Sequence, residues 1–174
     1  MSIEDIKNSI RNVPDFPKKG IQFKDITTAI KNPKIYREII DLMAQEFAHK
    51  KIDYVVGIEA RGFILGAALA YKLGCGFVPV RKANKLPAQV LTQKYALEYG
   101  TDSLEIHADA LENGTTALII DDLLATGGTA LATAKLVKQL GANVAAFAFV
   151  IELTDLNGAE KLIPFGKVIS LLRY

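Results

Sequence analysis

The sequence is poor in the features that mark disulfide-stabilised, membrane-spanning or nucleic-acid-binding proteins. A single cysteine, Cys75, excludes an intrachain disulfide, and no charged and then apolar leader precedes the first predicted helix. The longest apolar runs, residues 63–71 and 144–151, are well short of the ~20 residues that cross a bilayer. The net charge is only +2, and the basic residues are spread along the chain rather than gathered in one patch. We therefore expect a cytoplasmic protein with neither membrane nor nucleic acid among its partners.

Familiar nucleotide and metal signatures are missing as well. Gly57 and Gly62 have the spacing of a Walker A loop, but Phe63 follows in place of the lysine, which excludes a triphosphate loop. No G-x-G-x-x-G occurs, which excludes the dinucleotide fingerprint. His107 has no cluster of His, Cys or carboxylate residues at metal-ligand spacing, so we expect an exposed strand residue there and no zinc site.

The hydrophobic pattern predicts one α/β domain spanning residues 1–174, with a mostly parallel sheet flanked by helices. The chain has 50% hydrophobic and 23% charged residues, enough for one substantial core, and no repeat or linker interrupts it. Short apolar runs alternate with segments whose apolar residues recur at helical spacing. We expect strands at residues 54–58, 76–80, 118–120, 144–151 and 168–172, an extended piece at 21–25, and helices at 3–13, 33–47, 63–73, 131–140 and 158–162.

Residues 117–129 are the stretch that says most about function. The apolar run 118–120 predicts a buried strand that leads to Asp121 and Asp122, and ligands of open α/β sheets bind at such strand ends. The loop 125–129, Ala-Thr-Gly-Gly-Thr, opens a helix, so free backbone N–H groups, the helix dipole and two hydroxyls can hold a phosphate. Carboxylates suit the vicinal hydroxyls of a ribose or a hydrated magnesium ion. These features suggest a ribose 5-phosphate as the ligand.

Two further loops at the same edge of the predicted sheet carry cations. After the strand at 54–58, the sequence Glu-Ala-Arg-Gly of residues 59–62 places Arg61 at a helix N-terminus. Its forked guanidinium and the free backbone N–H groups there suit a pyrophosphate. After the strand at 76–80 come Arg81, Lys82 and Lys85. Taken alone, each cluster is also compatible with a solvated charged surface.

Residues 117–129 resemble the phosphoribosyl pyrophosphate motif of the type I phosphoribosyltransferases, and the wording DDLLATGGT resembles the adenine phosphoribosyltransferases in particular. EARGF at 59–63 is similar to that family's pyrophosphate loop, RKANKLP at 81–87 to its RKxxKLP segment, and LEYG at 97–100 to its hood motif. Two positions depart from the family pattern, because Gln22 replaces an aliphatic residue and Asn84 a commoner glycine. The resemblance covers nearly the whole chain, from the Pro14 loop to Leu172.

The resemblance implies transfer of a 5-phosphoribosyl group from its 1-pyrophosphate donor to adenine, with Mg²⁺ carried by the donor's pyrophosphate, in a homodimer. It also implies a base-binding segment within residues 1–32 and a flexible hood at 81–104, a region that lacks a sustained helical pattern, as lids do. The implied roles are catalysis by Glu98 and Arg61; ribose 5-phosphate binding by Asp121, Asp122, Ala125, Thr126, Gly127, Gly128 and Thr129; pyrophosphate binding by Glu59, Ala60, Arg61, Gly62, Arg81, Lys82 and Lys85; and adenine binding by Gln22, Phe23, Lys24, Arg61 and Leu123.

Two alternatives share the phosphate chemistry. A phosphoribosyltransferase for hypoxanthine, guanine or xanthine needs a different base edge, and the resemblance of the LEYG and EARG segments favours adenine. A transcription regulator that keeps the fold to bind an effector should carry an added DNA-binding region. We expect none, because no segment of these 174 residues is long enough to supply one.

Overall fold

The computed structural model describes residues 2–96 and 101–174. In these residues the main sheet has seven strands in the order β5-β6-β4-β3-β7-β8-β9, and β1 and β2 form a separate hairpin. The strands are β1 (Arg11–Pro14), β2 (Gln22–Asp25), β3 (Tyr54–Ile58), β4 (Gly76–Lys82), β5 (Val90–Ala96), β6 (Thr101–His107), β7 (Thr116–Leu124), β8 (Asn143–Glu152) and β9 (Lys167–Arg173). The helices are α1 (Ile3–Ser9), α2 (Thr27–Ile30), α3 (Pro33–Gln45), α4 (Arg61–Leu73) and α5 (Gly128–Gln139), with 3₁₀ turns η1 (Thr154–Leu156) and η2 (Gly158–Lys161).

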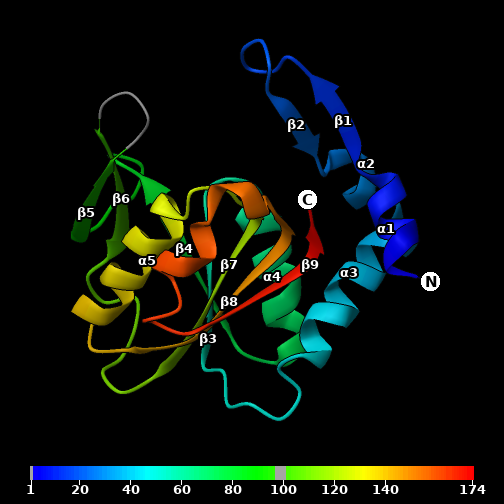
Figure 1. Ribbon diagram of the computed structural model, residues 1–174. Coiled ribbons are helices and arrows are strands. Elements are labelled where there is room, and N and C mark those ends of the chain that lie inside the picture. The colour runs from blue at the N-terminus through cyan, green and yellow to red at the C-terminus, as the bar shows by residue number, and fades with distance from the viewer. Residues whose placement is uncertain (1, 97–100) are drawn as a thin grey trace.

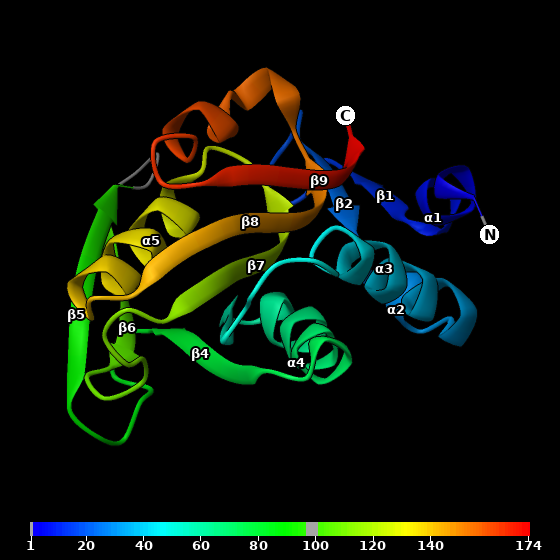
Figure 2. The ribbon, with the colours of Figure 1, turned by 90° about the horizontal axis from the view of Figure 1, so that it is seen from below.

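The predicted mostly parallel α/β sheet is confirmed. Strand β3 is parallel to both β4 and β7, and β8 is parallel to β7 and to β9. At the other edge, β6 runs antiparallel to β4 and β5, so the segment predicted as a hood contributes a β-ribbon. Helix α5 covers one face of the sheet and α3 and α4 cover the other, while the β1–β2 hairpin stands apart from both layers (Figures 1 and 2).

The core lies in two layers, one on each face of the sheet. Alternate residues of a strand point to opposite faces, and the buried clusters follow that alternation. Val55 packs into the cluster under α3 and α4, whereas its neighbour Val56 packs into the cluster under α5. In β7, Leu118 belongs to the first cluster and Ile119 to the second. A sheet buried on both faces explains why its strands read as continuous apolar runs.

Local sequence signals correctly marked several helix ends. The Asn32 side chain caps α3 by accepting from the backbone N–H of Lys34, and Pro33 occupies the first turn. Helix α4 ends at Gly74, whose φ of 70° is the left-handed conformation that glycine adopts without strain. Within residues 2–96 and 101–174, no helix combines the length and the apolar character needed to cross a membrane.

Two local predictions were wrong. The first helix was expected to continue to residue 13, but it ends at Ser9, and Val13 lies in β1 opposite Phe23 of β2. The helical spacing of Val13 is overridden by this hairpin pairing, which a periodicity argument cannot see. His107 was expected to be exposed, yet it is partly buried because β6 is covered on one side by β5, where Val90 is its partner.

Candidate active site

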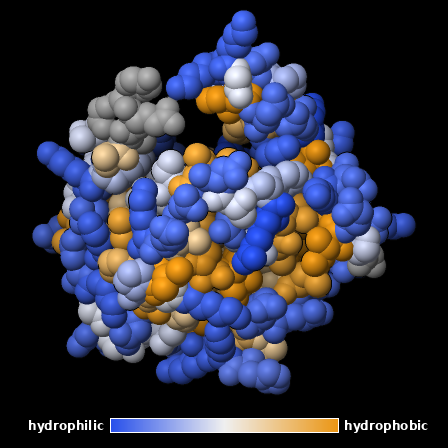
Figure 3. Space-filling model, viewed as in Figure 1, coloured by the Kyte–Doolittle hydropathy of each residue, from blue (hydrophilic) through white to orange (hydrophobic). Residues whose placement is uncertain are grey.

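The candidate site lies where β3, β4 and β7 end, below the β1–β2 hairpin. These parallel strands are neighbours, so the loops that follow them meet at one edge of the sheet. In the space-filling view the mostly hydrophilic hairpin rises from the molecule, and a notch in the surface runs beside it (Figure 3). The same edge faces upward in Figure 1. The predicted phosphate, ribose and pyrophosphate residues therefore come from one region.

Residues 125–129, the predicted phosphate loop, line a cavity of about 490 Å³. The rest of its lining is Tyr95, Ala96, Leu123, Leu124, Ala130, Phe149, Leu156 and Lys161. Gly127 has a φ of 79° and is the N-cap of α5, whose first backbone N–H groups lack partners within the helix. A Cβ on Gly127 would lie 2.6 Å from the carbonyl oxygen of Gly158, so the loop needs glycine for its conformation and for this close contact. The cavity has the concave shape and the free donors of a phosphate site.

Asp122 and Arg61 form an ion pair that sequence reasoning did not predict. The Nε of Arg61 donates to the carboxylate of Asp122, and Asp122 is only 3% exposed. Burial acts to lower the pKa of Arg61, but the hydrogen bond and the charge of Asp122 outweigh it and raise that pKa. The guanidinium is thus fixed at the start of α4, beside the end of β7.

Asp121 lies next to this pair and is the electrostatically unfavourable member of the site. Burial and the neighbouring charge of Asp122 raise the pKa of Asp121 well above its ordinary value. Its Oδ1 accepts the backbone N–H of Asp122 at 2.8 Å and faces the backbone of Gly62, where a Cβ would be 3.1 Å away. Two carboxylates and one guanidinium thus leave an excess negative charge at the strand end.

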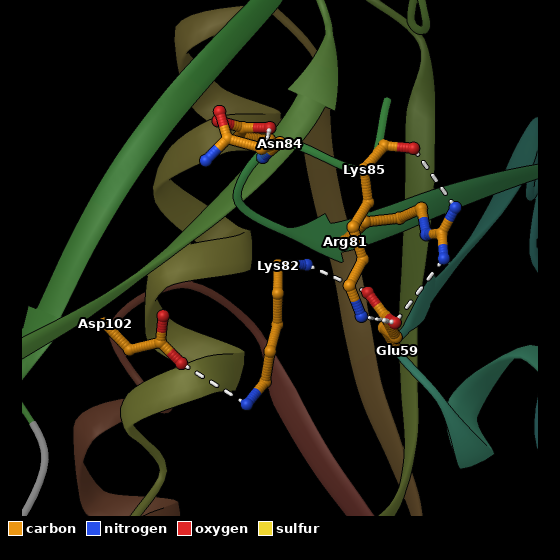
Figure 4. Close-up of polar contacts among 7 residues, drawn as sticks. Glu59, Arg81, Lys82, Asn84, Lys85 and Asp102 are labelled. Carbon is orange, nitrogen blue, oxygen red and sulfur yellow. Dashed lines mark hydrogen bonds and ion pairs between the residues drawn. The ribbon is translucent and has the colours of Figure 1, made fainter. Parts of the chain in front are cut away.

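The basic residues at the end of β4 and in the loop after it gather around Glu59. Figure 4 shows Lys85 Nζ donating to Glu59 Oε1 at 2.5 Å, with Arg81 Nη2 3.5 Å from the same oxygen. The backbone N–H of Lys82 donates to Glu59 Oε2 at 3.0 Å. Burial acts to raise the pKa of Glu59, but the bonds from these groups lower it overall. The cations of this cluster are therefore paired with a carboxylate whose side chain is only 11% exposed, while the Lys82 and Lys85 side chains remain open to solvent, as the alternative of a charged surface also expects.

Other bonds hold this basic loop against the ribbon. Lys82 Nζ is paired with Asp102 of β6 at 3.4 Å, and the backbone N–H of Asn84 donates to Glu105 at 2.9 Å. Asn84 has a φ of 63°, a left-handed conformation that asparagine tolerates better than most residues, which explains why it can replace the commoner glycine. The peptide bond between Glu59 and Ala60 is cis.

The predicted adenine residues divide between the hairpin and the sheet. Phe23 packs edge-on against Phe16, with ring centroids 5.1 Å apart, and the Arg61 guanidinium carbon lies 5.6 Å from the Phe23 ring centre. Gln22 and Lys24 bond to Asn12 across the hairpin. Leu123 lines the cavity of the phosphate loop. Arg61 therefore connects the hairpin to the carboxylate pair.

Glu98, the predicted catalytic carboxylate, lies outside the described residues. Just before it in the chain, Tyr95 lines the phosphate-loop cavity, and its hydroxyl donates to Asp102 at 3.2 Å. Burial, together with the charge of Asp102, raises the pKa of Tyr95 to about 12. Sequence reasoning missed Tyr95, although its position in the hood segment beside LEYG was an available signal.

Lys161 was missed as well. Its Nζ donates to the carbonyl oxygen of Thr126 at 2.8 Å, which ties η2 to the phosphate loop and brings a cation to the cavity wall. No motif surrounds Lys161 in the sequence, so its place at the cavity wall could not be predicted. In the part of the chain that the structure describes, no group of three or more His, Cys, Asp or Glu side chains is arranged to hold a metal ion.

Comparisons with known proteins agree with this geometry. The family described as "Phosphoribosyl transferase domain" matches residues 27–164. An adenine phosphoribosyltransferase of Chlorobium luteolum is 56% identical over 172 residues, which cover 97% of each chain. A crystal structure of adenine phosphoribosyltransferase from Thermoanaerobacter pseudethanolicus is 53% identical, with a TM-score of 0.96, and covers 99% of this chain and 100% of its own.

A third relative was solved with ligands. The adenine phosphoribosyltransferase of Saccharomyces cerevisiae, complexed with adenine and an imino-altritol bisphosphate, is 42% identical to this chain. Its TM-score is 0.92, and the match covers 97% of both chains. With a family match over most of its length and full-length relatives above half identity, the chain belongs to the type I phosphoribosyltransferases and, among them, to the adenine phosphoribosyltransferases.

Proposed function

We propose that this protein transfers the 5-phosphoribosyl group of 5-phosphoribosyl 1-pyrophosphate to adenine, giving AMP and pyrophosphate in purine salvage. The observation that carries the proposal is the meeting of three groups at one sheet edge. These are the glycine-rich phosphate cavity, the carboxylates near the end of β7, and the cations at the start of α4, at the end of β4 and in the loop after β4. The full-length identity to adenine phosphoribosyltransferases supports adenine as the acceptor.

The phosphate loop and the carboxylates hold and orient the donor. Residues 125–129 bind the 5-phosphate through the N-terminus of α5 and so fix the position of the reacting carbon. Asp121 and Asp122 accept hydrogen bonds from the ribose hydroxyls. Mg²⁺ enters with the donor's pyrophosphate as part of the substrate, because Mg²⁺ in proteins is usually bound through substrate phosphates and one or two carboxylates.

The cations act on the leaving group. A nitrogen of adenine forms a bond to the anomeric carbon as the bond to pyrophosphate breaks, so negative charge grows on the departing oxygens while the ribose gains oxocarbenium character. Arg61, together with Arg81 and Lys85 of the same or of the neighbouring subunit, stabilises that departing charge. Glu59 holds Arg81 and Lys85 close together before the substrate binds. These cations are therefore already positioned for pyrophosphate, which takes the place of the Glu59 carboxylate as their anionic partner. Lys82 adds its charge near the pyrophosphate, and its backbone N–H, which donates to Glu59, helps to hold the loop in place.

Adenine binds between the hairpin and the sheet. Phe23 stacks on the purine, Leu123 packs on its other face, and the backbone of Gln22 and Lys24 contacts the base edge. Arg61, at 5.6 Å from the Phe23 ring, then lies between the base and the departing pyrophosphate. Glu98 takes the proton that the attacking ring must lose.

We also propose that the working form is a homodimer in which Arg81 or Lys85 reaches the partner's site. Large apolar side chains on the outer face of α4 support an interface there, since Ile64 is 44% and Tyr71 91% exposed. Size-exclusion chromatography with light scattering measures the mass directly. A monomer at working concentrations contradicts this proposal.

The function is tested by supplying the donor and Mg²⁺ with adenine, hypoxanthine, guanine or orotate, and following the nucleotide formed. We expect AMP from adenine and little product from the other three. Faster turnover of a 6-oxopurine would move the protein to the alternative purine specificity. Ligand binding without turnover of any base would favour the alternative of a regulator.

A further inference from the structure

We propose that Tyr174 is a positioning residue for adenine, because its ring holds the β1–β2 hairpin in the orientation that turns Phe23 toward Arg61. This inference rests on the proposed function for its link to adenine. Its structural part, the anchoring of the hairpin, stands independently. Tyr174 follows β9, at the side of the sheet from which the hairpin rises (Figures 1 and 2).

The hairpin needs an external anchor because its strands pair with each other and form a sheet separate from the main one in the described residues. Its strongest ties are internal. Arg11 pairs with Asp25 at 2.5 Å, and Asp25 also accepts the backbone N–H of Thr27. Such bonds fix the shape of the hairpin, and the backbone N–H of Arg11 donates to the Thr28 side chain of α2 at 3.1 Å, but none of these bonds connects the hairpin to the main sheet. A two-stranded hairpin is marginally stable by itself, so packing outside it decides where it lies.

Tyr174 is itself firmly placed. Its carbonyl oxygen accepts from both the backbone N–H and the hydroxyl of Thr154, at 2.8 and 2.7 Å. Its own N–H donates to Glu152 of β8 at 2.9 Å. The residue is partly buried and packs against the core layer under α3 and α4. The ring is therefore attached to the rigid sheet.

Two cations of the N-terminal region lie over this ring. Lys24 Nζ of β2 is 4.4 Å from the ring centre, and Lys7 Nζ of α1 is 5.5 Å from it. Both distances fall within the reach of cation–π attraction, which is stronger where the ring is shielded from water. One aromatic ring fixed to the sheet thus attracts both α1 and β2.

The strand geometry passes this anchoring on to Phe23. Successive residues of a strand point to opposite faces, so Lys24 on one face of β2 requires Phe23 on the other. The Lys24 face is further fixed by its bond to Asn12, at 3.1 Å. Phe23 then meets the Arg61 guanidinium on the side of the candidate site. Rotation of the hairpin away from Tyr174 would carry Phe23 away from Arg61.

The test compares Tyr174→Leu and Tyr174→Phe with the parent enzyme. Leucine keeps apolar bulk but has no π face, whereas phenylalanine keeps the face and lacks the hydroxyl. We expect Tyr174→Leu to raise the KM for adenine about fivefold, the size of one moderate cation–π contact, with the KM for the donor within about twofold of the parent. Tyr174→Phe should restore the parent KM for adenine. Equal rises in both KM values, or no rise, overturn the inference.

Lysine variants keep the test decisive if Tyr174→Leu folds poorly. Lys7→Met removes one cation from the ring and should raise the KM for adenine about twofold. Lys50→Met is the matched control, because Lys50 Nζ lies 5.6 Å from the centre of the Phe47 ring, in the segment before β3 and hence at the opposite end of the sheet. It should leave both KM values unchanged. Similar effects of the two lysine variants contradict a specific role for the Tyr174 ring.

Hydrogen exchange separates this inference from the proposed function. The amides of residues 11–25 should exchange faster in Tyr174→Leu than in the parent, whatever base the enzyme uses. If the parent enzyme does not use adenine, the proposed function is wrong, and the kinetic part of the inference fails with it. The exchange rates of residues 11–25 still decide whether Tyr174 anchors the hairpin. Unchanged exchange in Tyr174→Leu overturns the anchoring even if adenine is the substrate.

Discussion

Asp121→Asn should stabilise the folded protein and at the same time impair its use of the donor. Asp121 shares the end of β7 with the Asp122–Arg61 ion pair, so its charge is in excess of the local cation. Asparagine keeps the size of the side chain and can still accept the backbone N–H of residue 122. Only the excess charge of Asp121 is removed, and the ion pair remains.

The sign of the pH dependence follows from the raised pKa. A carboxyl group whose folded-state pKa lies above its unfolded value stabilises the fold below the unfolded pKa, near pH 4. It loses that contribution as pH rises through the folded pKa. The gain from Asp121→Asn should therefore be larger at pH 8 than at pH 5. Single stabilising changes give about 0.5–2 kcal/mol, and each kcal/mol shifts the Tm of a chain this size by roughly 2–4 °C.

The control is Asp122→Asn, which removes the partner of Arg61. The Arg61 side chain is 43% exposed and can be rehydrated, so we expect a loss of about 1 kcal/mol instead of a gain. Both variants should lower kcat/KM for the donor about 10- to 100-fold, because each removes a charged acceptor for a ribose hydroxyl. Thermal melts at the two pH values and initial rates measure these effects. A Tm gain for Asp121→Asn that is absent, or larger at pH 5, refutes the electrostatic reasoning, and normal donor kinetics refute the ribose role.

Three further predictions concern other parts of the site. Gly127→Ala should lower the Tm more than Gly114→Ala. Both positions have φ near +80°, but the new Cβ would lie 2.6 Å from the carbonyl oxygen of Gly158 at position 127 and would meet nothing within 4 Å at position 114. Equal losses of Tm would contradict close packing of the loop. Glu98→Ala should lower kcat by ~10² to 10⁴-fold with little change in donor affinity, and Glu98→Gln separates proton transfer from positioning; turnover within about threefold of the parent in both variants, with chemistry rate-limiting, would leave Glu98 without a catalytic role. Arg81→Ala subunits mixed with Glu98→Ala subunits should regain activity in hybrid sites, and hybrids that form without regaining activity would place Arg81 in its own subunit's site.

The sequence was sufficient for features that depend on near neighbours along the chain. The run Tyr54–Ile58 forms β3 with the predicted bounds, and the Asn32 cap and the Gly74 stop lie where expected, because each depends on a few adjacent residues. The end of α1 was mispredicted for the complementary reason. Val13 fits a helix by spacing, and only its pairing with Phe23 of the second strand decides otherwise.

The ion pairs of the site could not be predicted because they depend on which strands are neighbours. Asp122 and Arg61 are 61 residues apart in sequence, and they meet because Gly57 of β3 lies opposite Ile120 of β7 in parallel register. Likewise, Ile58 opposite Val80 brings Glu59 beside the loop that carries Lys85. Hydrophobic runs predict that strands exist, but they do not predict the order of the strands in the sheet. The resemblance gave the residues of each loop, and the register explains how they come together.

Strand order also explains why few elements suffice for the proposed site, which must hold a base, a ribose, a 5-phosphate and a pyrophosphate. Strand β3 is central, with β4 on one side and β7 on the other, and adjacent strands lie about 4.8 Å apart. The three loops that follow them are therefore spaced over roughly 10 Å, a distance comparable to the length of a ribose with its phosphates. The segment proposed to stack on adenine, residues 22–24, has no strand in this sheet and lies in the separate hairpin. The proposed adenine site therefore depends on how that hairpin is oriented over the sheet, and the residues that anchor it should affect adenine more than the donor.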